Sequence, residues 1–168
     1  MSDAAPSKLR AWGSSAAQTA LWLVVALSIV AWLGSAAPPA TIPDVPVLAL
    51  NASTPVSLAS VKGKPTLLYF WATWCGACKV ARPVVENFAR RNPEVRVLAI
   101  TTEPRATVQR AFADEGPAYE IFLAGQGILS ALNITAFPTF IAVNAAGAPT
   151  WRRSGVPIPG ELDLRATP

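Results

Sequence analysis

Trp71-Ala72-Thr73-Trp74-Cys75-Gly76-Ala77-Cys78-Lys79 holds both cysteines of the 168-residue chain. The apolar run before it, residues 66–71, predicts a buried strand, and a helix is expected to begin at the motif. Such a helix places the first sulfur where free N–H groups and the helix dipole favour an anion. Because the thiolate is the nucleophile in disulfide exchange, this placement indicates redox chemistry. We therefore predict Cys75 as the nucleophile and Cys78, one turn later, as the thiol that resolves the mixed disulfide.

The composition argues against most other uses of this cysteine pair. A zinc site needs about four nitrogen or sulfur ligands, and the chain has no histidine and no third cysteine. A c-type haem needs a histidine after the second cysteine, where Lys79 stands. A structural disulfide would close too short a loop to restrict the unfolded chain much. Two inert buried thiols remain the alternative. We expect neither a metal nor a cofactor.

The N-terminal region predicts a membrane anchor. Residues 1–15 carry Lys8 and Arg10, which by the positive-inside rule stay in the cytoplasm. Residues 16–37 carry no charge and would span about 33 Å as a transmembrane helix, enough for a bilayer core. A cleaved signal peptide is the alternative, since residues 34–37 are small. With either a membrane anchor or a cleaved signal peptide, the rest of the chain is expected outside the cytosol.

The motif region resembles a known family. Residues 61–78, Val-Lys-Gly-Lys-Pro-Thr-Leu-Leu-Tyr-Phe-Trp-Ala-Thr-Trp-Cys-Gly-Ala-Cys, resemble the thioredoxin-like proteins of the TlpA type, membrane-tethered thiol-disulfide oxidoreductases of bacteria. The resemblance covers residues 43–155. Within the family, Gly76-Ala77 and the single anchor are similar to the suppressor-of-copper-sensitivity protein D type. The resemblance implies an inner-membrane protein with one span and a catalytic domain in the periplasm.

A second segment supports the resemblance. Residues 133–140, Asn-Ile-Thr-Ala-Phe-Pro-Thr-Phe, are similar to the family segment that carries a cis-proline facing the active site. The resemblance implies that Pro138 is cis and presents the backbone of Phe137 to an extended substrate. An ordinary loop proline is the alternative, since few X-Pro bonds are cis. We expect Trp74 to join this docking surface beside the nucleophile, with a packed core aromatic as the alternative.

The rest of the chain predicts an α/β domain with a thioredoxin-like fold. A proline-rich linker, residues 38–46, leads into this domain at residues 47–168. Strands that alternate with helices and then end in a hairpin indicate a mixed central sheet flanked by helices. We expect strands at residues 47–50, 55–58, 66–71, 95–101, 119–123, 139–143 and 150–154, and helices from the cysteine motif to residue 92 and at 106–115, 127–132 and 160–165. The strand at 119–123 is predicted to lie at a sheet edge, and 160–165 has disorder as its alternative.

One departure from the family concerns the proton of Cys78. Thioredoxins carry a buried acid six residues before the first cysteine, and many TlpA-type proteins carry a glutamate three residues after the second. Tyr69 and Ala81 occupy these positions here. Glu103, after the second core strand, and Glu86, two turns along the helix, are therefore the candidate proton acceptors, with water as the alternative.

The direction of exchange follows from how strongly the site stabilises the Cys75 thiolate. Because no histidine lies between the cysteines, we predict a reductase of disulfides in exported proteins, such as apocytochrome c or copper-handling proteins. In an oxidising compartment it would need a membrane electron donor of the DsbD type. An oxidase or isomerase on the same fold is one alternative. A copper(I) carrier that uses both thiolates is another, although Met1 is the only methionine.

Charge argues against a nucleic-acid partner. The net charge of +4 is spread over scattered sites such as Arg90-Arg91 and Arg152-Arg153. No basic stripe interleaved with stacking aromatic residues is present. We therefore expect protein substrates and a membrane surface as the partners, and no nucleic acid.

Overall fold

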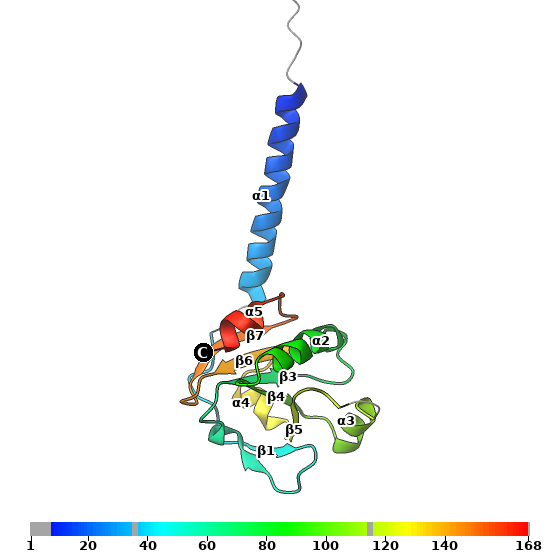
Figure 1. The fold of residues 1–168 in the computed structure, drawn as a ribbon, viewed down its shortest axis with the longest axis vertical. Coiled ribbons are helices and arrows are strands. Elements are labelled where there is room, and N and C mark those ends of the chain that lie inside the picture. Colours follow the sequence, from blue (N-terminus) through cyan, green and yellow to red (C-terminus); the bar gives the residue numbers. More distant parts are fainter. Residues whose placement is uncertain (1–7, 35–36, 114–115, 168) are drawn as a thin grey trace, which may run out of the picture. The chain divides into compact units, whose positions relative to one another are not determined.

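The computed structural model describes residues 8–34, 37–113 and 116–167, with the side chains of 8–15 and 30–34 left out. The chain divides into two compact units, residues 1–35 and 36–168. The first holds helix α1 (Lys8–Gly34), which includes most of the predicted anchor (Figure 1). Within the described part of the chain, no helix is both long enough and apolar enough to cross a membrane.

The second unit is built on a mixed sheet. Among the described residues it has seven strands in the order β2-β1-β5-β4-β3-β6-β7. β3 pairs in parallel with β4, and β4 with β5, while the other neighbours are antiparallel. The strands are β1 (Pro46–Ala49), β2 (Val56–Ser57), β3 (Thr66–Phe70), β4 (Arg96–Thr101), β5 (Glu120–Ala124), β6 (Thr139–Val143) and β7 (Pro149–Ser154).

β3 is the strand that delivers the cysteine motif, and all five of its residues are buried. Its side chains alternate between the two faces of the sheet, as the period of a strand requires. Leu67 and Tyr69 enter one core, and Leu68 and Phe70 enter the other. Burial on both faces explains why this stretch is a continuous apolar run.

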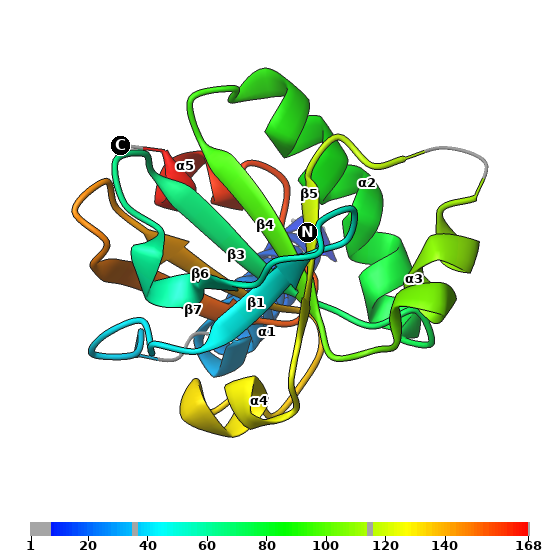
Figure 2. The same cartoon turned by 90° about the horizontal axis from the view of Figure 1, so that it is seen from below.

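Helices cover both faces of the sheet. They are α2 (Gly76–Arg91), α3 (Arg105–Ala111), α4 (Gly127–Ala131) and α5 (Glu161–Ala166), with a 3-10 turn at Leu58–Ser60. Buried residues of α2, α3 and α5 share the core that contains Tyr69. Those of α4 and the 3-10 turn share the core that contains Phe70. Figure 2 shows α4 on the opposite side of the sheet from α2 and α5.

The predicted mixed sheet flanked by helices is confirmed, with two corrections. The strand predicted at an edge, residues 119–123, is interior: β5 lies between β4 and β1. The N-terminal hairpin covers it, because Val47 of β1 pairs with Ala124. The helix predicted at 106–115 ends at Ala111. The N–H of Phe112 donates to the carbonyl of Gln109 in a tighter turn, which closes the helix early.

The C-terminal segment, for which helix or disorder was expected, forms α5. Leu162 is buried in the core beneath α2. A buried ion pair joins α5 to β7, with Nη1 of Arg153 at 2.9 Å from Oε1 of Glu161. The other oxygen of Glu161 accepts from the N–H of Ile158. Apolar burial and this satisfied carboxylate together hold the last helix in place.

Candidate active site

Cys75 is the N-cap of α2. Its backbone is extended, with φ −77° and ψ 109°, so the chain turns from β3 into the helix at this residue. Its Sγ accepts a hydrogen bond from the backbone N–H of Cys78 at 3.1 Å. The predicted placement of the first sulfur at the helix N-terminus is therefore confirmed. In the reduced protein the same N–H and the helix dipole stabilise a thiolate there.

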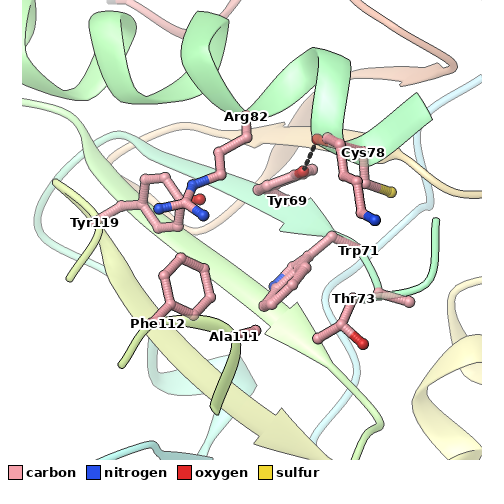
Figure 3. A pocket seen from close by; sticks show the side chains of 10 residues that line it. Tyr69, Trp71, Thr73, Cys78, Arg82, Ala111, Phe112 and Tyr119 are labelled. Carbon is pink, nitrogen blue, oxygen red and sulfur yellow. Dashed lines mark hydrogen bonds between the residues drawn. The ribbon is translucent and has the colours of Figure 1, made fainter. Parts of the chain in front are cut away.

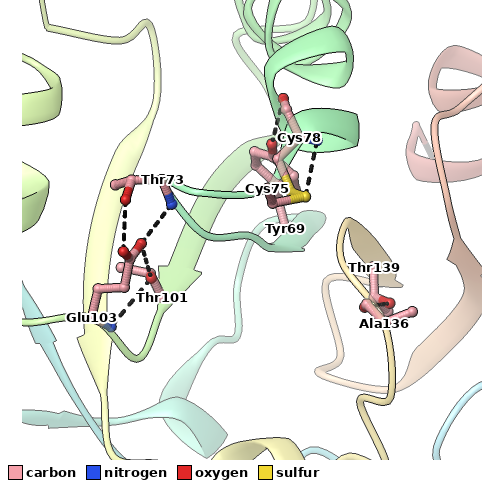
Figure 4. Close-up of a disulfide and its surroundings, with 8 residues drawn as sticks. All are labelled: Tyr69, Thr73, Cys75, Cys78, Thr101, Glu103, Ala136 and Thr139. Atoms are coloured by element: carbon pink, nitrogen blue, oxygen red, sulfur yellow. Dashed lines mark hydrogen bonds between the residues drawn. A yellow bond between two sulfur atoms is a disulfide. The ribbon is translucent and has the colours of Figure 1, made fainter.

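The two cysteines form a disulfide, with Cα atoms 5.2 Å apart (Figure 4). Cys75 is 5 % exposed and Cys78 is 3 % exposed. Little of either cysteine is open to a partner, so the residues that surround the disulfide decide which partner can reach it.

The loop before Cys75 is held by Glu103. One carboxylate oxygen accepts from the backbone N–H of Thr73 at 2.6 Å, and the other accepts from the Thr73 hydroxyl at 2.7 Å. The hydroxyl of Thr101, at the end of β4, adds a longer contact at 3.4 Å. Figure 4 shows this cluster on one side of the disulfide. Glu103 is thus a loop anchor, and its role as proton acceptor stays a prediction.

Glu86, the other candidate acceptor, is engaged on the surface of α2. Its carboxylate pairs with Arg82 at 2.9 Å and with Arg90 at 3.4 Å. These ion pairs are its contacts in the structure, so proton transfer from Cys78 to Glu86 also stays a prediction.

Residues 133–140, here called the proline segment, lie on the other side of the disulfide. The Phe137–Pro138 peptide bond is cis, as the resemblance implied. In Figure 4 the neighbouring residues Ala136 and Thr139 lie across the disulfide from Thr73. Trp74 is 72 % exposed, so it is not a core aromatic. Its ring meets that of Phe137 edge to face at 6.0 Å, which links the cysteine loop to the proline segment.

A cavity of about 280 Å³ lies beside Cys78 (Figure 3). Tyr69, Trp71, Phe112 and Tyr119 form aromatic walls around it. The hydroxyl of Tyr69 donates to the carbonyl of Cys78 at 3.3 Å. Burial raises the pKa of Tyr69 and of Tyr119 above the ordinary phenol value, against the opposing charge of a nearby arginine. Both hydroxyls are therefore neutral at pH 7, which leaves each of them able to donate a hydrogen bond.

The part of the chain that forms this site matches a protein-family model. Residues 33–165 match the model described as Redoxin. The chain belongs to the Redoxin family.

Relatives of this Redoxin chain include secreted and thioredoxin-like proteins. The soluble secreted antigen MPT53 of Mycobacterium tuberculosis is 30% identical over 139 residues, which cover 80% of this chain and 69% of the antigen. The thioredoxin-like protein YneN of Bacillus subtilis is 33% identical, covering 54% of this chain and 56% of its own. The thiol:disulfide interchange protein DsbE of Xylella fastidiosa is 27% identical over 88% of this chain and 68% of the DsbE chain.

Solved structures share the fold of the Redoxin domain. The mycobacterial DsbF structure superposes with a TM-score of 0.66 at 23% identity and covers 77% of this chain and 97% of its own. The structure described as a DsbE from Chlorobium tepidum superposes with a TM-score of 0.65 at 17% identity. The match covers 76% of this chain and 92% of the DsbE chain. With the family and the Cys75–Cys78 disulfide, this fold identifies a thioredoxin-like thiol-disulfide oxidoreductase.

Sequence reasoning missed Arg152, a buried anchor of the proline segment. The sequence pattern placed it only among the scattered positive charges, and Arg152 is 7 % exposed. Its guanidinium donates to the carbonyls of Leu132 and Asn133, at the end of α4. Burial lowers the pKa of Arg152 below its ordinary value. The signal available in the sequence was two adjacent arginines in a strand, because successive side chains of a strand cannot both face the same side.

Two further contacts from the end of β7 reach the same segment. The hydroxyls of Ser154 and Thr139 are hydrogen-bonded at 2.8 Å, and the N–H of Gly155 donates to the carbonyl of Pro138 at 2.8 Å. The edge strand β7 therefore fixes the position of Pro138 in this Redoxin site, a role the sequence did not suggest.

The Glu103 contact gives a testable prediction. In Glu103→Gln the amide has one acceptor oxygen in place of two and no charge, so one of the two Thr73 donors loses its acceptor and the other keeps a neutral one. We expect the free energy of unfolding to fall by about 1–2 kcal/mol, measured by urea unfolding with both cysteines oxidised. Glu94→Gln, an exposed surface change, is the control and should stay within about 0.5 kcal/mol. Equal effects from the two variants would contradict the anchoring role.

Proposed function

We propose that this oxidoreductase acts as a reductase of disulfides in exported proteins. In its reduced form the Cys75 thiolate attacks one sulfur of a substrate disulfide and forms a mixed disulfide. The Cys78 thiolate then attacks Cys75, which releases the substrate as a dithiol and leaves the Cys75–Cys78 disulfide. Two electrons pass from the cysteine pair to the substrate, and the two protons of the thiols end on the released dithiol.

The hydrogen bond from the N–H of Cys78 to Sγ of Cys75 carries this proposal. It places the nucleophile at the helix N-terminus, where backbone N–H groups stabilise the thiolate. Gly76 and Ala77 supply no donor side chain between the cysteines. Strong oxidants owe their potential to a strongly stabilised reduced form, so this moderate stabilisation supports reduction as the direction.

The second part of the proposal concerns the location of the catalytic domain. Residues 16–37 carry no charge, and Leu21, Trp22 and Leu27 of α1 are more than half exposed. We infer that α1 tethers the catalytic domain to the inner membrane, on its periplasmic side. The relatives named as a secreted antigen and as DsbE support a site outside the cytosol. A reductase there must regain electrons through the membrane, from a donor of the DsbD type.

The redox state of the cysteine pair in cells tests the proposal. Cells that make the full chain are quenched in acid, and free thiols are labelled with a maleimide that shifts the chain on a gel. A reductase is kept reduced by its donor, so most of the chain should carry two labels. A chain that is almost wholly unlabelled would show a disulfide donor and would contradict the proposed direction.

An isomerase is the second candidate. The structure described as a thio-disulfide isomerase from Thermus thermophilus superposes with a TM-score of 0.63 at 25% identity and covers 77% of this chain and 93% of its own. An isomerase would also be kept reduced, so the two differ in product. An isomerase restores activity to a protein with mispaired disulfides, whereas a reductase leaves it with free thiols.

A further inference from the structure

The cavity beside Cys78 is lined by positive charge and by no negative charge. Lys79 and Arg82 belong to its wall, and none of the described lining residues is acidic. Two carboxylates behind the wall offset part of this charge: Glu86 is shared between Arg82 and Arg90, and Glu103 binds Thr73. The two cations therefore stand on the inner wall of a partly enclosed, aromatic cavity, an arrangement that favours an anionic group there.

Several donors at the cavity have no acceptor in the described part of the protein. The guanidinium of Arg82 lies 4.4 Å from the ring centroid of Phe112 and donates to Glu86 through Nε, while neither Nη group has an acceptor among the described residues. The ammonium of Lys79 makes no ion pair with a described residue. Figure 3 shows the guanidinium beside Tyr119, whose hydroxyl likewise has no described partner. An apolar occupant would desolvate these donors without pairing them.

The cavity adjoins the disulfide on the side of Thr73. The disulfide lies between the proline segment on one side and Thr73 on the other (Figure 4). Thr73 and Cys78 also line the cavity. A chain that binds along Pro138 and crosses the sulfurs therefore continues toward Lys79 and Arg82.

We propose that this cavity receives an acidic side chain of the substrate, placed close in sequence to the cysteine under attack. The carboxylate accepts from Arg82, Lys79 and Tyr119, and its methylene groups contact the aromatic walls. The inference rests on the proposed function, because it assigns a sequence preference to the same active site. It predicts faster reduction of disulfides with a neighbouring glutamate than of those with a neutral isostere.

Matched peptide disulfides test this preference. Three synthetic peptides carry one intramolecular disulfide and differ only in a Glu, Gln or Lys placed two residues from the first cysteine. The reduced full chain is mixed with each, and the second-order rate constant is followed by the change in tryptophan fluorescence. We expect the Glu peptide to react about three- to fivefold faster than the Gln peptide at low salt, with the Lys peptide slowest. The ratio should shrink in 0.5 M salt.

Substitutions of three basic residues of α2 show which side chains cause the preference for the Glu peptide. Arg82→Gln should bring the Glu to Gln ratio close to one, and Lys79→Gln should lower it in part. Arg90→Gln makes the same charge change on the same helix and also removes a partner of Glu86, but Arg90 does not line the cavity, so it should keep the ratio. Any one of three results would overturn the assignment. They are a Glu to Gln ratio near one in the unchanged chain, a ratio that survives Arg82→Gln, and equal losses in Arg82→Gln and Arg90→Gln. Reduction of none of the peptides would instead overturn the proposed function.

Discussion

A Cys75→Ser chain is expected to reduce disulfides at least about 1,000-fold more slowly than the unchanged chain. The serine hydroxyl does not ionise at neutral pH, and the helix N-terminus that stabilises a thiolate at this N-cap cannot compensate. The rate is measured as insulin reduction with dithiothreitol as the electron source. Serine is a good N-cap, so the free energy of unfolding should be compared with that of the reduced chain. A rate loss below tenfold would contradict Cys75 as the nucleophile.

Cys78→Ser should give a different outcome. Attack by Cys75 still occurs, but the mixed disulfide cannot be resolved, so covalent complexes with exported proteins accumulate and disappear on treatment with dithiothreitol. Non-reducing gels of cells that make the variant show these complexes, and the double variant with Cys75→Ser is the control. A copper(I) carrier would only lose metal affinity in Cys78→Ser. The absence of any mixed disulfide would therefore favour the carrier over the oxidoreductase.

Arg152→Met should destabilise the fold more than any other single change to a charged residue considered above. The variant leaves the carbonyls of Leu132 and Asn133 without their guanidinium donors in a largely buried site. Each unpaired carbonyl costs about 1–3 kcal/mol, so we expect a loss of about 2–4 kcal/mol in urea unfolding. Methionine keeps most of the apolar stem, which limits the loss to the polar contacts.

Arg110→Met is the matched control, because its guanidinium donates only to its own helix at an exposed position. It should change the free energy of unfolding by no more than about 0.5 kcal/mol. Since Arg152 also positions the proline segment, Arg152→Met should raise the KM for a peptide disulfide more than it lowers kcat. A variant as stable as the control, with an unchanged KM, would show that the anchor has no such role.

The part of the site that is formed by consecutive residues was predictable from sequence. A buried strand, two cysteines and a helix lie next to one another in residues 66–91, so local pattern was enough to place Cys75 at an N-cap. Pro138 became predictable only through the family resemblance, because nothing in its own neighbours distinguishes a cis proline from a loop proline.

The contacts between distant segments were not predictable. Charged residues are usually exposed, so the burial of Arg152 depends on carbonyls twenty residues earlier, which the topology alone brings near. The contact of the Glu103 carboxylate with Thr73, thirty residues away, was likewise not visible in the sequence. The cavity joins Arg82 of α2 with Phe112 after α3 and Tyr119 before β5. Only the packed sheet and helices create such neighbours.

The reduction potential of the Cys75–Cys78 pair tests the central claim most directly. The full chain in detergent is equilibrated with glutathione or dithiothreitol buffers of known ratio, and the reduced fraction is read by thiol labelling. A reductase that receives its electrons from the cytosol should have a potential near that of thioredoxin, about −270 mV. A potential near that of DsbA, about −120 mV, would mean a strongly stabilised thiolate and a disulfide donor, and would contradict the account.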